Sequence, residues 1–474
     1  MIKIQISKFK FQNSKDFTPH HFSRYMFGLM NCTKSGAGFT LVELLVAVAL
    51  TAIVFIGIFT AFQGGMRILV ENKARSTAIS LANERIEFIR NLSYEKIGTI
   101  GGIPSSDIPQ QENKTLNGIN FLVKTFIQYI DDPADGSGAQ DENGITTDYK
   151  KVRVETIWQA KSGQKSVTLI SNFSPSGIET ITGGGTLIIN VLDASSNPVS
   201  QAEVKIENSK TSPPISLTVL TNEQGKVIFP GSPAADSYKI TITKTNYNTA
   251  KTYDATLENP NPSPGHLTIL EGETTGATFS IDRLGQITVQ TFEYTAEPLS
   301  PLLPNLTFQI RGEKTIGKDG QGNPIYKYSK DLTTDSNGNS IIANLEWDTY
   351  TITVSSQTGY DLMESCPPQP LSLLPTGSIT NNLTLISHTS NSLLVLVKNA
   401  SGNLIEGASI RLFKQSIGYD KTIPSSVCGQ AFFNSLTSYP DYSLEVIKSG
   451  YQNYLLENIY ISGQNNLTVI LNTP

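Results

Sequence analysis

Residue types that support catalysis or nucleic-acid binding are scarce in this sequence of 474 residues. Only four histidines are present, and His266 and His388 are the two that lie beyond the first 38 residues. They are far apart in the sequence, which argues against a histidine-based metal site. Basic residues number 36 against 41 acidic ones, so the chain lacks the positive footprint of a nucleic-acid-binding protein.

Catalytic patterns are missing as well. The sequence shows no pairing of a nucleophile with a base, no phosphate-binding glycine loop and no metal-ligand spacing. Paired acids of the kind that glycan-processing enzymes use do not stand out either. We therefore expect a structural or binding protein without enzyme activity, without a resident cofactor and without a nucleic-acid partner.

Charge and proline are nearly absent from residues 39–62, which contain one charged residue, Glu43, and no proline. As a helix this stretch would extend about 36 Å, enough to cross a hydrocarbon core of about 30 Å. Small and polar residues precede the apolar run, whereas a secretory signal peptide carries its small-residue cleavage site after the run. The stretch therefore predicts a single membrane-spanning helix.

The lone acid in this helix is the informative residue, because a carboxylate in a membrane is costly and by default marks function. A carboxylate that reaches the lipid headgroups at the interface is the structural alternative. The string around it resembles the processing signal of type IV pilins and type II secretion pseudopilins. Six residues carry that resemblance: Gly38, Phe39, Thr40, Leu41, Val42 and Glu43.

The resemblance implies a mature chain that begins at residue 39. In that family a prepilin peptidase cleaves after the glycine, here Gly38, and methylates the new N-terminal residue, here Phe39. The acid at the fifth mature position, here Glu43, is thought to pair with the amine of a neighbouring subunit during assembly. An ammonium and a carboxylate in lipid are each less costly when they meet, which agrees with that role. Other pilins or pseudopilins would therefore be partners of this helix.

The first 38 residues would then be a leader peptide. They hold six basic residues and one acid, which predicts a cytoplasmic N-terminus with the rest of the chain outside. Their removal leaves 30 basic against 40 acidic residues. Met30 would begin a leader of the usual family length, so the first 29 residues are either a misassigned start or a true extension.

Cysteine is rare: Cys32 lies in the leader, and only Cys366 and Cys428 lie in the exported part. Outside the cytoplasm disulfides form and persist. We predict a bridge between Cys366 and Cys428 that would lock two domains together, with two separate free thiols as the alternative.

After the span, apolar residues continue at three- and four-residue spacing and predict an amphipathic helix that ends near Lys96. This apolar stripe comprises Ala78, Ala82, Ile86, Ile89 and Leu92. Three alternating runs, at residues 120–129, 151–158 and 166–170, then predict antiparallel strands packed on the helix. A long helix followed by a small sheet is the pilin pattern.

An acidic loop separates the first two of these strands and contains Asp132, Asp135 and Asp141. Calcium takes about six to eight hard oxygen ligands, often from a flexible loop of this kind. Some pseudopilins bind calcium in an acidic loop of the head, although the spacing here does not match an EF-hand. The loop is therefore either a calcium site or a solvated hairpin connection.

The rest of the chain repeats one pattern three times. Residues 187–206 align without a gap with residues 393–412, and each segment is a strand, a turn and a second strand opened by alanine. Each copy continues through a glycine turn to a strand led by Tyr238, Tyr350 or Tyr442. This order resembles the carboxypeptidase regulatory-like and Cna-B families and predicts sandwiches with immunoglobulin-like or prealbumin-like architecture.

The expected fold class is an α+β pilin-like N-terminal part followed by three tandem all-β sandwiches. The predicted divisions are a leader (1–38), the helix (39–97), the sheet head (98–182) and three sandwiches (183–283, 284–388 and 389–474).

The pilin resemblance implies a membrane-anchored minor pilin-like subunit of a type IV filament that displays the sandwiches for adhesion or interaction. A pseudopilin of a type II secretion or DNA-uptake system is the alternative, with the sandwiches binding cargo. The expected location is the bacterial cytoplasmic membrane with the C-terminal domains outside it, on the filament or cell surface after assembly. The sandwiches would meet a surface ligand that the sequence does not name.

Overall fold

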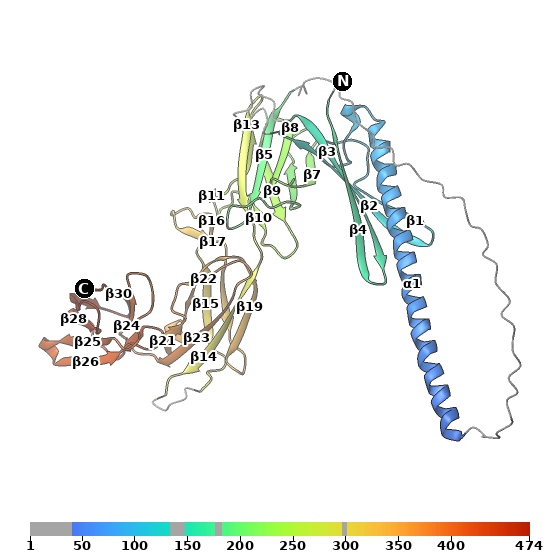
Figure 1. Ribbon diagram of the computed structural model, residues 1–474. Coiled ribbons are helices and arrows are strands. Elements are labelled where there is room, and N and C mark those ends of the chain that lie inside the picture. Colours follow the sequence, from blue (N-terminus) through green and yellow to red (C-terminus); the bar gives the residue numbers. More distant parts are fainter. Residues whose placement is uncertain (1–39, 133–146, 176–182, 296–300) are drawn as a thin grey trace, which may run out of the picture. The chain divides into compact units, whose positions relative to one another are not determined.

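The computed structural model describes residues 40–132, 147–175, 183–295 and 301–474. It contains one long helix followed by a series of mainly antiparallel sheets, which confirms the expected fold class (Figure 1). The chain divides into two compact units at residue 70, within the helix, and each is considered by itself.

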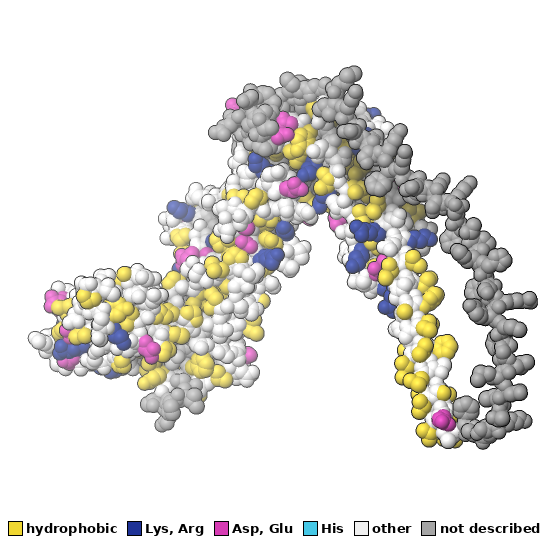
Figure 2. Space-filling model, in the orientation of Figure 1, with side chains coloured by type: hydrophobic (Ala, Val, Ile, Leu, Met, Phe, Trp, Pro, Cys, Tyr) yellow, Lys and Arg dark blue, Asp and Glu magenta, His cyan; other side chains and the backbone are white. Residues whose placement is uncertain are grey.

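Helix α1 (Leu41–Arg90) is continuous over 50 residues and passes through Gly64 and Gly65 without a break. Its first part, residues 41–70, exposes almost all of its apolar side chains, which appear as yellow atoms along the helix in Figure 2. The helix ends at Arg90, earlier than the predicted end near Lys96, and the separate 3-10 turn η1 (Tyr94–Lys96) accounts for the difference.

The second part of the helix packs against the sheet of the head. Ala78, Ala82 and Ile89 are fully buried, and the small alanines let the sheet come close. Facing them, Phe121 and Val154 are also buried. Each fully buried aliphatic side chain of this kind stabilises the head by roughly 1.5–3 kcal/mol.

The sheet of the head has four strands where the sequence predicted three. They are, in sheet order, β1 (Gln111–Leu116), β2 (Ile119–Ile130), β3 (Tyr149–Ala160) and β4 (Gly163–Phe173). The extra strand β1 is an edge strand with no buried residue, so it carries no apolar alternation that the sequence could reveal.

Sandwich 1 follows the head and encloses its own core, which includes Leu187, Ile189, Val204 and Ile240. One sheet has the order β13-β5-β8 and the other β10-β9-β6-β7, with β12 also on β9. Their bounds are β5 (Gly185–Leu192), β6 (Glu203–Asn208), β7 (Ile215–Leu220), β8 (Lys226–Ser232), β9 (Ala235–Thr243), β10 (Ala250–Lys251), β12 (Leu267–Ile269) and β13 (Thr274–Ser280).

Sandwich 2 has two four-stranded sheets, β19-β14-β23-β21 and β18-β15-β20-β22. Their bounds are β14 (Gly285–Glu293), β15 (Thr307–Gly312), β18 (Ser329–Thr333), β19 (Asn339–Leu345), β20 (Asp348–Thr353), β21 (Tyr360–Cys366), β22 (Leu371–Leu373) and β23 (Ser378–Ser387). A 3-10 turn, η3 (Ser356–Thr358), precedes β21. A separate small sheet, β11-β16-β17, joins β11 (Asn261–Pro262) of sandwich 1 to the hairpin β16 (Thr315–Lys318) and β17 (Pro324–Tyr326).

Sandwich 3 repeats the design of sandwich 1, with sheets β27-β24-β30 and β26-β25-β28-β29. Their bounds are β24 (Ser392–Asn399), β25 (Ser409–Lys414), β26 (Tyr419–Pro424), β27 (Gln430–Phe433), β28 (Tyr439–Ile447), β29 (Tyr454–Ile461) and β30 (Gln464–Leu471), with a 3-10 turn η4 (Gln415–Ile417). Its core includes Leu393, Val395, Leu412 and Phe433.

The repeated residues do the same structural work in each copy. Tyr238, Tyr350 and Tyr442 are all buried, and each hydroxyl donates to a backbone carbonyl four or five residues earlier. This is the tyrosine corner of immunoglobulin-like sandwiches. The repeated turn glycines Gly225 and Gly429 both have φ near +70°, a conformation that favours glycine.

Candidate functional site

The described chain begins at Thr40, so Gly38 and Phe39 of the expected processing signal lie outside the described residues. Glu43 lies in the first turn of α1 and is exposed. Its carboxylate accepts hydrogen bonds from the Thr40 N–H and hydroxyl, each at 3.0 Å, and its own N–H donates to Thr40 Oγ1 at 3.3 Å. This reciprocal pair is a capping box, which satisfies donors at the helix start.

Sequence reasoning did not assign Thr40 a role, although the Thr-x-x-Glu spacing before an apolar run is the signature of this cap. The cap also places the negative carboxylate at the positive end of the helix dipole. Because Glu43 is exposed, its carboxylate can exchange these local bonds for an amine of another chain.

The helix that carries Glu43 is long and apolar enough to cross a membrane. In its first 30 residues Leu44, Ile53 and Phe59 are each more than 60% exposed, as are most of their apolar neighbours. Such a surface is expected to be covered by lipid or by the helices of other subunits.

Of the three acids in the expected calcium loop, only Asp132 is described, and Asp135 and Asp141 lie outside the described residues. The Asp132 N–H donates to Asp148 Oδ2 at 2.5 Å, which ties the start of the loop to its return. Among the residues that the structure describes, no three His, Cys, Asp or Glu side chains gather closely enough to hold a metal ion.

One histidine takes part in a chain of hydrogen bonds that the sequence did not reveal. His266 Nδ1 lies 3.0 Å from Thr252 Oγ1, and its Nε2 lies 2.9 Å from Asp254 Oδ1. The order hydroxyl, imidazole, carboxylate is that of a hydrolase triad. However, Thr252 is buried and its hydroxyl oxygen accepts the Ile240 N–H, so the group braces two strands and is not presented to a substrate.

Contacts tie the head to sandwich 1. Gln128 Nε2 donates to the Leu220 carbonyl, and Lys151 pairs with Glu223 at 3.0 Å. Ile103, from the head, is buried in the core cluster of sandwich 1.

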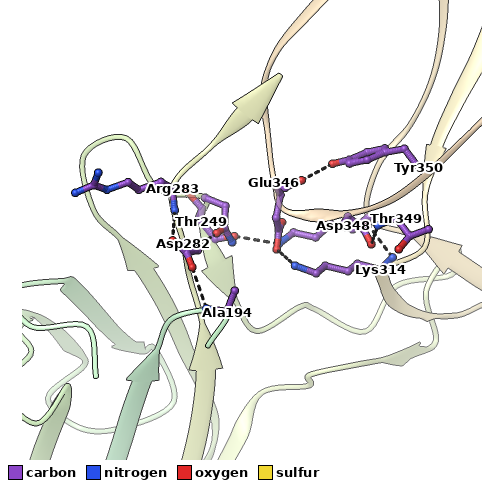
Figure 3. Close-up of polar contacts among 11 residues, drawn as sticks. Ala194, Thr249, Asp282, Arg283, Lys314, Glu346, Asp348, Thr349 and Tyr350 are labelled. Carbon is purple, nitrogen blue, oxygen red and sulfur yellow. Dashed lines mark hydrogen bonds and ion pairs between the residues drawn. The ribbon is translucent and has the colours of Figure 1, made fainter. Parts of the chain in front are cut away.

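A denser polar cluster ties sandwich 1 to sandwich 2 (Figure 3). Glu346 pairs with Lys314 at 2.8 Å and with Lys327 at 2.5 Å, and Lys327 also donates to the Thr249 carbonyl of sandwich 1 at 3.2 Å. Burial lowers the pKa of Lys314, and the pairing with Glu346 opposes that effect. Nearby, Asp282 accepts the Ala194 N–H at 3.0 Å and so holds the connection between the two domains.

Backbone pairing reinforces this junction. Asn261 and Pro262 of β11 lie opposite Lys318 and Gly317 of β16, and the Ser263 N–H donates to the Ile316 carbonyl at 2.9 Å. A loop of sandwich 1 is thus an added strand on a hairpin inserted in sandwich 2, and such main-chain bonding restricts rotation between the domains.

The junction between sandwiches 2 and 3 contains a disulfide between Cys366 and Cys428, whose Cα atoms are 5.7 Å apart. Beside it, the Gln430 amide both donates to the Ser365 carbonyl at 2.6 Å and accepts the Ser365 N–H at 3.1 Å. Phe432 is 7% exposed, although its neighbours Ala431 and Phe433 are the residues that face the core of sandwich 3. The junction is therefore covalent, hydrogen-bonded and partly apolar at once.

A cleft of about 400 Å³ lies next to this disulfide, between sandwiches 2 and 3. Its polar lining is mainly hydroxyl and amide side chains, such as Thr353, Gln369 and Asn466, and its only charged residues are Glu313 and Asp361. Asp361 is already bonded to His388 at 2.6 Å. The cleft can hydrogen-bond a neutral group but offers no acid–base pair for a reaction.

Comparisons with solved structures return large surface proteins at low similarity. The Bacillus anthracis TIE protein is 16% identical, with 77% of this chain and 73% of that one covered and a TM-score of 0.18. A streptococcal ancillary pilin is 14% identical, with 61% and 99% covered and a TM-score of 0.17. BcpA, the major pilin subunit of Bacillus cereus, is 11% identical, with 61% and 100% covered and a TM-score of 0.16. At TM-scores this low, neither a domain arrangement nor a function passes from these structures to this chain.

Family patterns match two parts of the sequence, while no curated protein matches it significantly. Residues 33–59 match the prokaryotic N-terminal methylation motif, and residues 186–280, which are sandwich 1, match the carboxypeptidase regulatory-like domain. The first motif implies processing by a prepilin peptidase and assembly with other pilins, and together with the apolar helix it fits membrane anchoring. The chain is therefore a pilin-like protein in which the N-terminal methylation motif precedes a carboxypeptidase regulatory-like sandwich.

Proposed function

We propose that this chain is a minor subunit of a type IV filament, anchored by α1 and displaying its three sandwiches for adhesion or another surface interaction. The observation that carries the proposal is the methylation motif at residues 33–59, with an exposed Glu43 at the start of an apolar helix. About 290 residues follow the head, and such bulk on every subunit would crowd a filament, which supports a low-copy or tip position.

The proposal requires cleavage after Gly38 and methylation of Phe39. Mass spectrometry of the N-terminal peptide, from cells that have or lack the prepilin peptidase, tests this directly. We expect a peptide that begins with N-methylated Phe39 only when the peptidase is present. An assembled protein that still carries residues 1–38 would contradict the proposal.

The role of Glu43 can be separated from its role in the cap. Glutamine at this position still completes a capping box, whereas it removes the charge that an amine would need. We therefore expect Glu43→Gln to lose assembly into filaments and Thr40→Ala, which weakens the cap but keeps the carboxylate, to retain most of it. Sheared-filament fractions probed for the chain measure both, and full assembly of Glu43→Gln would remove the charge-pairing role.

The place of the sandwiches is tested by immunogold labelling with an antibody to residues 389–474. Label along or at the end of filaments is expected. Label confined to the cell envelope would instead favour a pseudopilin of a type II secretion or DNA-uptake system. We propose no catalytic activity and no resident cofactor, and the ligand of the sandwiches is a surface molecule of unassigned class.

A further inference from the structure

The first and last strands of every sandwich lie next to each other and run parallel. Strand β5 pairs with β13, β14 with β23, and β24 with β30. The chain enters each sandwich at the start of the first strand and leaves at the end of the last one. Entry and exit therefore lie at opposite ends of a parallel pair, and tension slides the strands along each other rather than peeling them apart.

The pair in sandwich 1 is continuous over seven residue pairs, from Thr186 opposite Thr274 to Leu192 opposite Ser280. Backbone bonds close both ends: the Thr186 N–H donates to Glu273 O, and the Ile281 N–H donates to Leu192 O, each at 2.9 Å. Bonds in a parallel ladder are evenly spaced, so a sliding force is shared along the whole pair. A peeling force would load the same bonds one after another.

Little free chain separates sandwich 1 from sandwich 2, because β13 ends at Ser280 and β14 begins at Gly285. The connection itself is bonded to sandwich 1: the Asn248 N–H donates to Asp282 O at 3.0 Å, and the Leu284 N–H donates to Asn246 O at 3.1 Å. Tension on the chain therefore reaches the paired strands without first extending a linker.

Between sandwiches 2 and 3 the disulfide offers a shorter covalent path than the polypeptide. Tension that reaches Cys366 can pass through sulfur to Cys428, so residues 367–427, which include β23 and β24, lie outside the path. Sandwich 1 contains no cysteine and lies wholly within the path. Its β5–β13 pair therefore carries the tension with no covalent bypass.

We propose that this chain transmits tension between its N-terminal helix and its C-terminal sandwich, with the β5–β13 pair as the mechanical clamp. The disulfide shields the chain around the last junction from extension. The proposal depends on the proposed function only for the source of the tension, since a chain fixed in a filament and bound at its far end is pulled at both ends.

Single-molecule force spectroscopy on the full chain in detergent, with handles at both termini, tests the clamp. A second attachment, through a clickable residue at the exposed Ser195, pulls from the turn after β5 and thus from the same end as Ser280. We expect sandwich 1 to unfold about tenfold faster or more at equal force in this peeling geometry, since its bonds no longer share the force. Sandwiches 2 and 3 are the internal reference, and equal rates for sandwich 1 in both geometries would overturn the proposal.

A matched pair of proline variants tests the same bonds in the terminal geometry. The bonds at Thr186 and Ile281 place the N–H groups of Thr275, Ala277 and Phe279 toward β5, because alternate residues of a strand point the same way. Those of Gly276 and Thr278 face the open edge of the sheet, where proline is tolerated.

We expect Ala277→Pro to speed forced unfolding of sandwich 1 about fivefold or more and Thr278→Pro to change it little. Equal effects of the two variants would contradict the clamp, and the geometry comparison still decides the matter if Ala277→Pro does not fold. These rates are measured on the isolated chain, so loss of filament assembly in Glu43→Gln leaves them unchanged. The two proposals can therefore fail separately.

Discussion

Replacing Cys366 and Cys428 together with serine removes the disulfide but leaves the contacts around it in place. The Gln430 amide keeps both bonds to Ser365, and Phe432 remains in the junction. We therefore expect the folded state to persist and the loss to appear in the free energy of unfolding.

The size of that loss follows from the length of chain that the bridge closes. Cys366 and Cys428 are separated by 62 positions, and in the chain-entropy account a loop of that length stabilises the folded state by about 4 kcal/mol. With an m-value of about 2–3 kcal/mol/M for a domain of this size, the urea midpoint falls by about 1.5–2 M.

Tryptophan fluorescence can report this transition, because Trp347 lies in sandwich 2 and Trp158 in the head. In a Trp158→Phe background the signal comes from sandwich 2 alone. Reducing agent should lower the midpoint of the parent by the same amount and leave the double-serine variant unchanged. A shift below about 0.5 M, or a parent that does not respond to reduction, would refute the reasoning.

Three further predictions use other parts of the chain. Gly225→Ala should destabilise sandwich 1 by more than the roughly 1–2 kcal/mol expected for Gly272→Ala, as measured by urea unfolding. Both glycines have φ near +70°, but only at Gly225 would a Cβ overlap a backbone oxygen, whereas the space around Gly272 is open. Hydrogen bonds from His266 and Lys239 lower the pKa of Asp254 to about 2. Because this folded-state pKa is depressed, its stabilisation is complete above about pH 4 and is lost as the pH falls toward 2. The carboxyl is largely exposed, so we expect less than about 1 kcal/mol, absent in Asp254→Asn, in acid titrations of stability. Calorimetric titration of the full chain with Ca²⁺ tests the acidic loop: a bound ion requires heat that Asp132→Asn reduces, and no heat in the parent leaves a solvated loop.

The features that were predictable from sequence are those written in local periodicity. An uncharged run long enough for a membrane, a helical stripe and alternating strands each depend on neighbouring residues. The repeated tyrosines and turn glycines were visible because each copy meets the same local demand, a corner hydrogen bond or a positive φ.

The errors fall where a local signal was weak. Strand β1 is polar and exposed, so only its pairing with β2 defines it. The helix end was placed too late because the turn at Tyr94–Lys96 continues the helical spacing after α1 has ended at Arg90. Thr40 was overlooked as a cap because the motif around it drew attention to its role in processing.

Local chemistry along the chain thus sufficed for the anchor, the order of domains and the recognisable processing signal. Which strands become neighbours did not follow from it, because the parallel closure of β5 on β13 joins residues about 90 positions apart. The meeting of Cys366 with Cys428 and the pairing of β11 with β16 likewise depend on how whole domains pack. Such long-range pairings are selected by burial and hydrogen bonding summed over entire sheets, and no short stretch of residues encodes them.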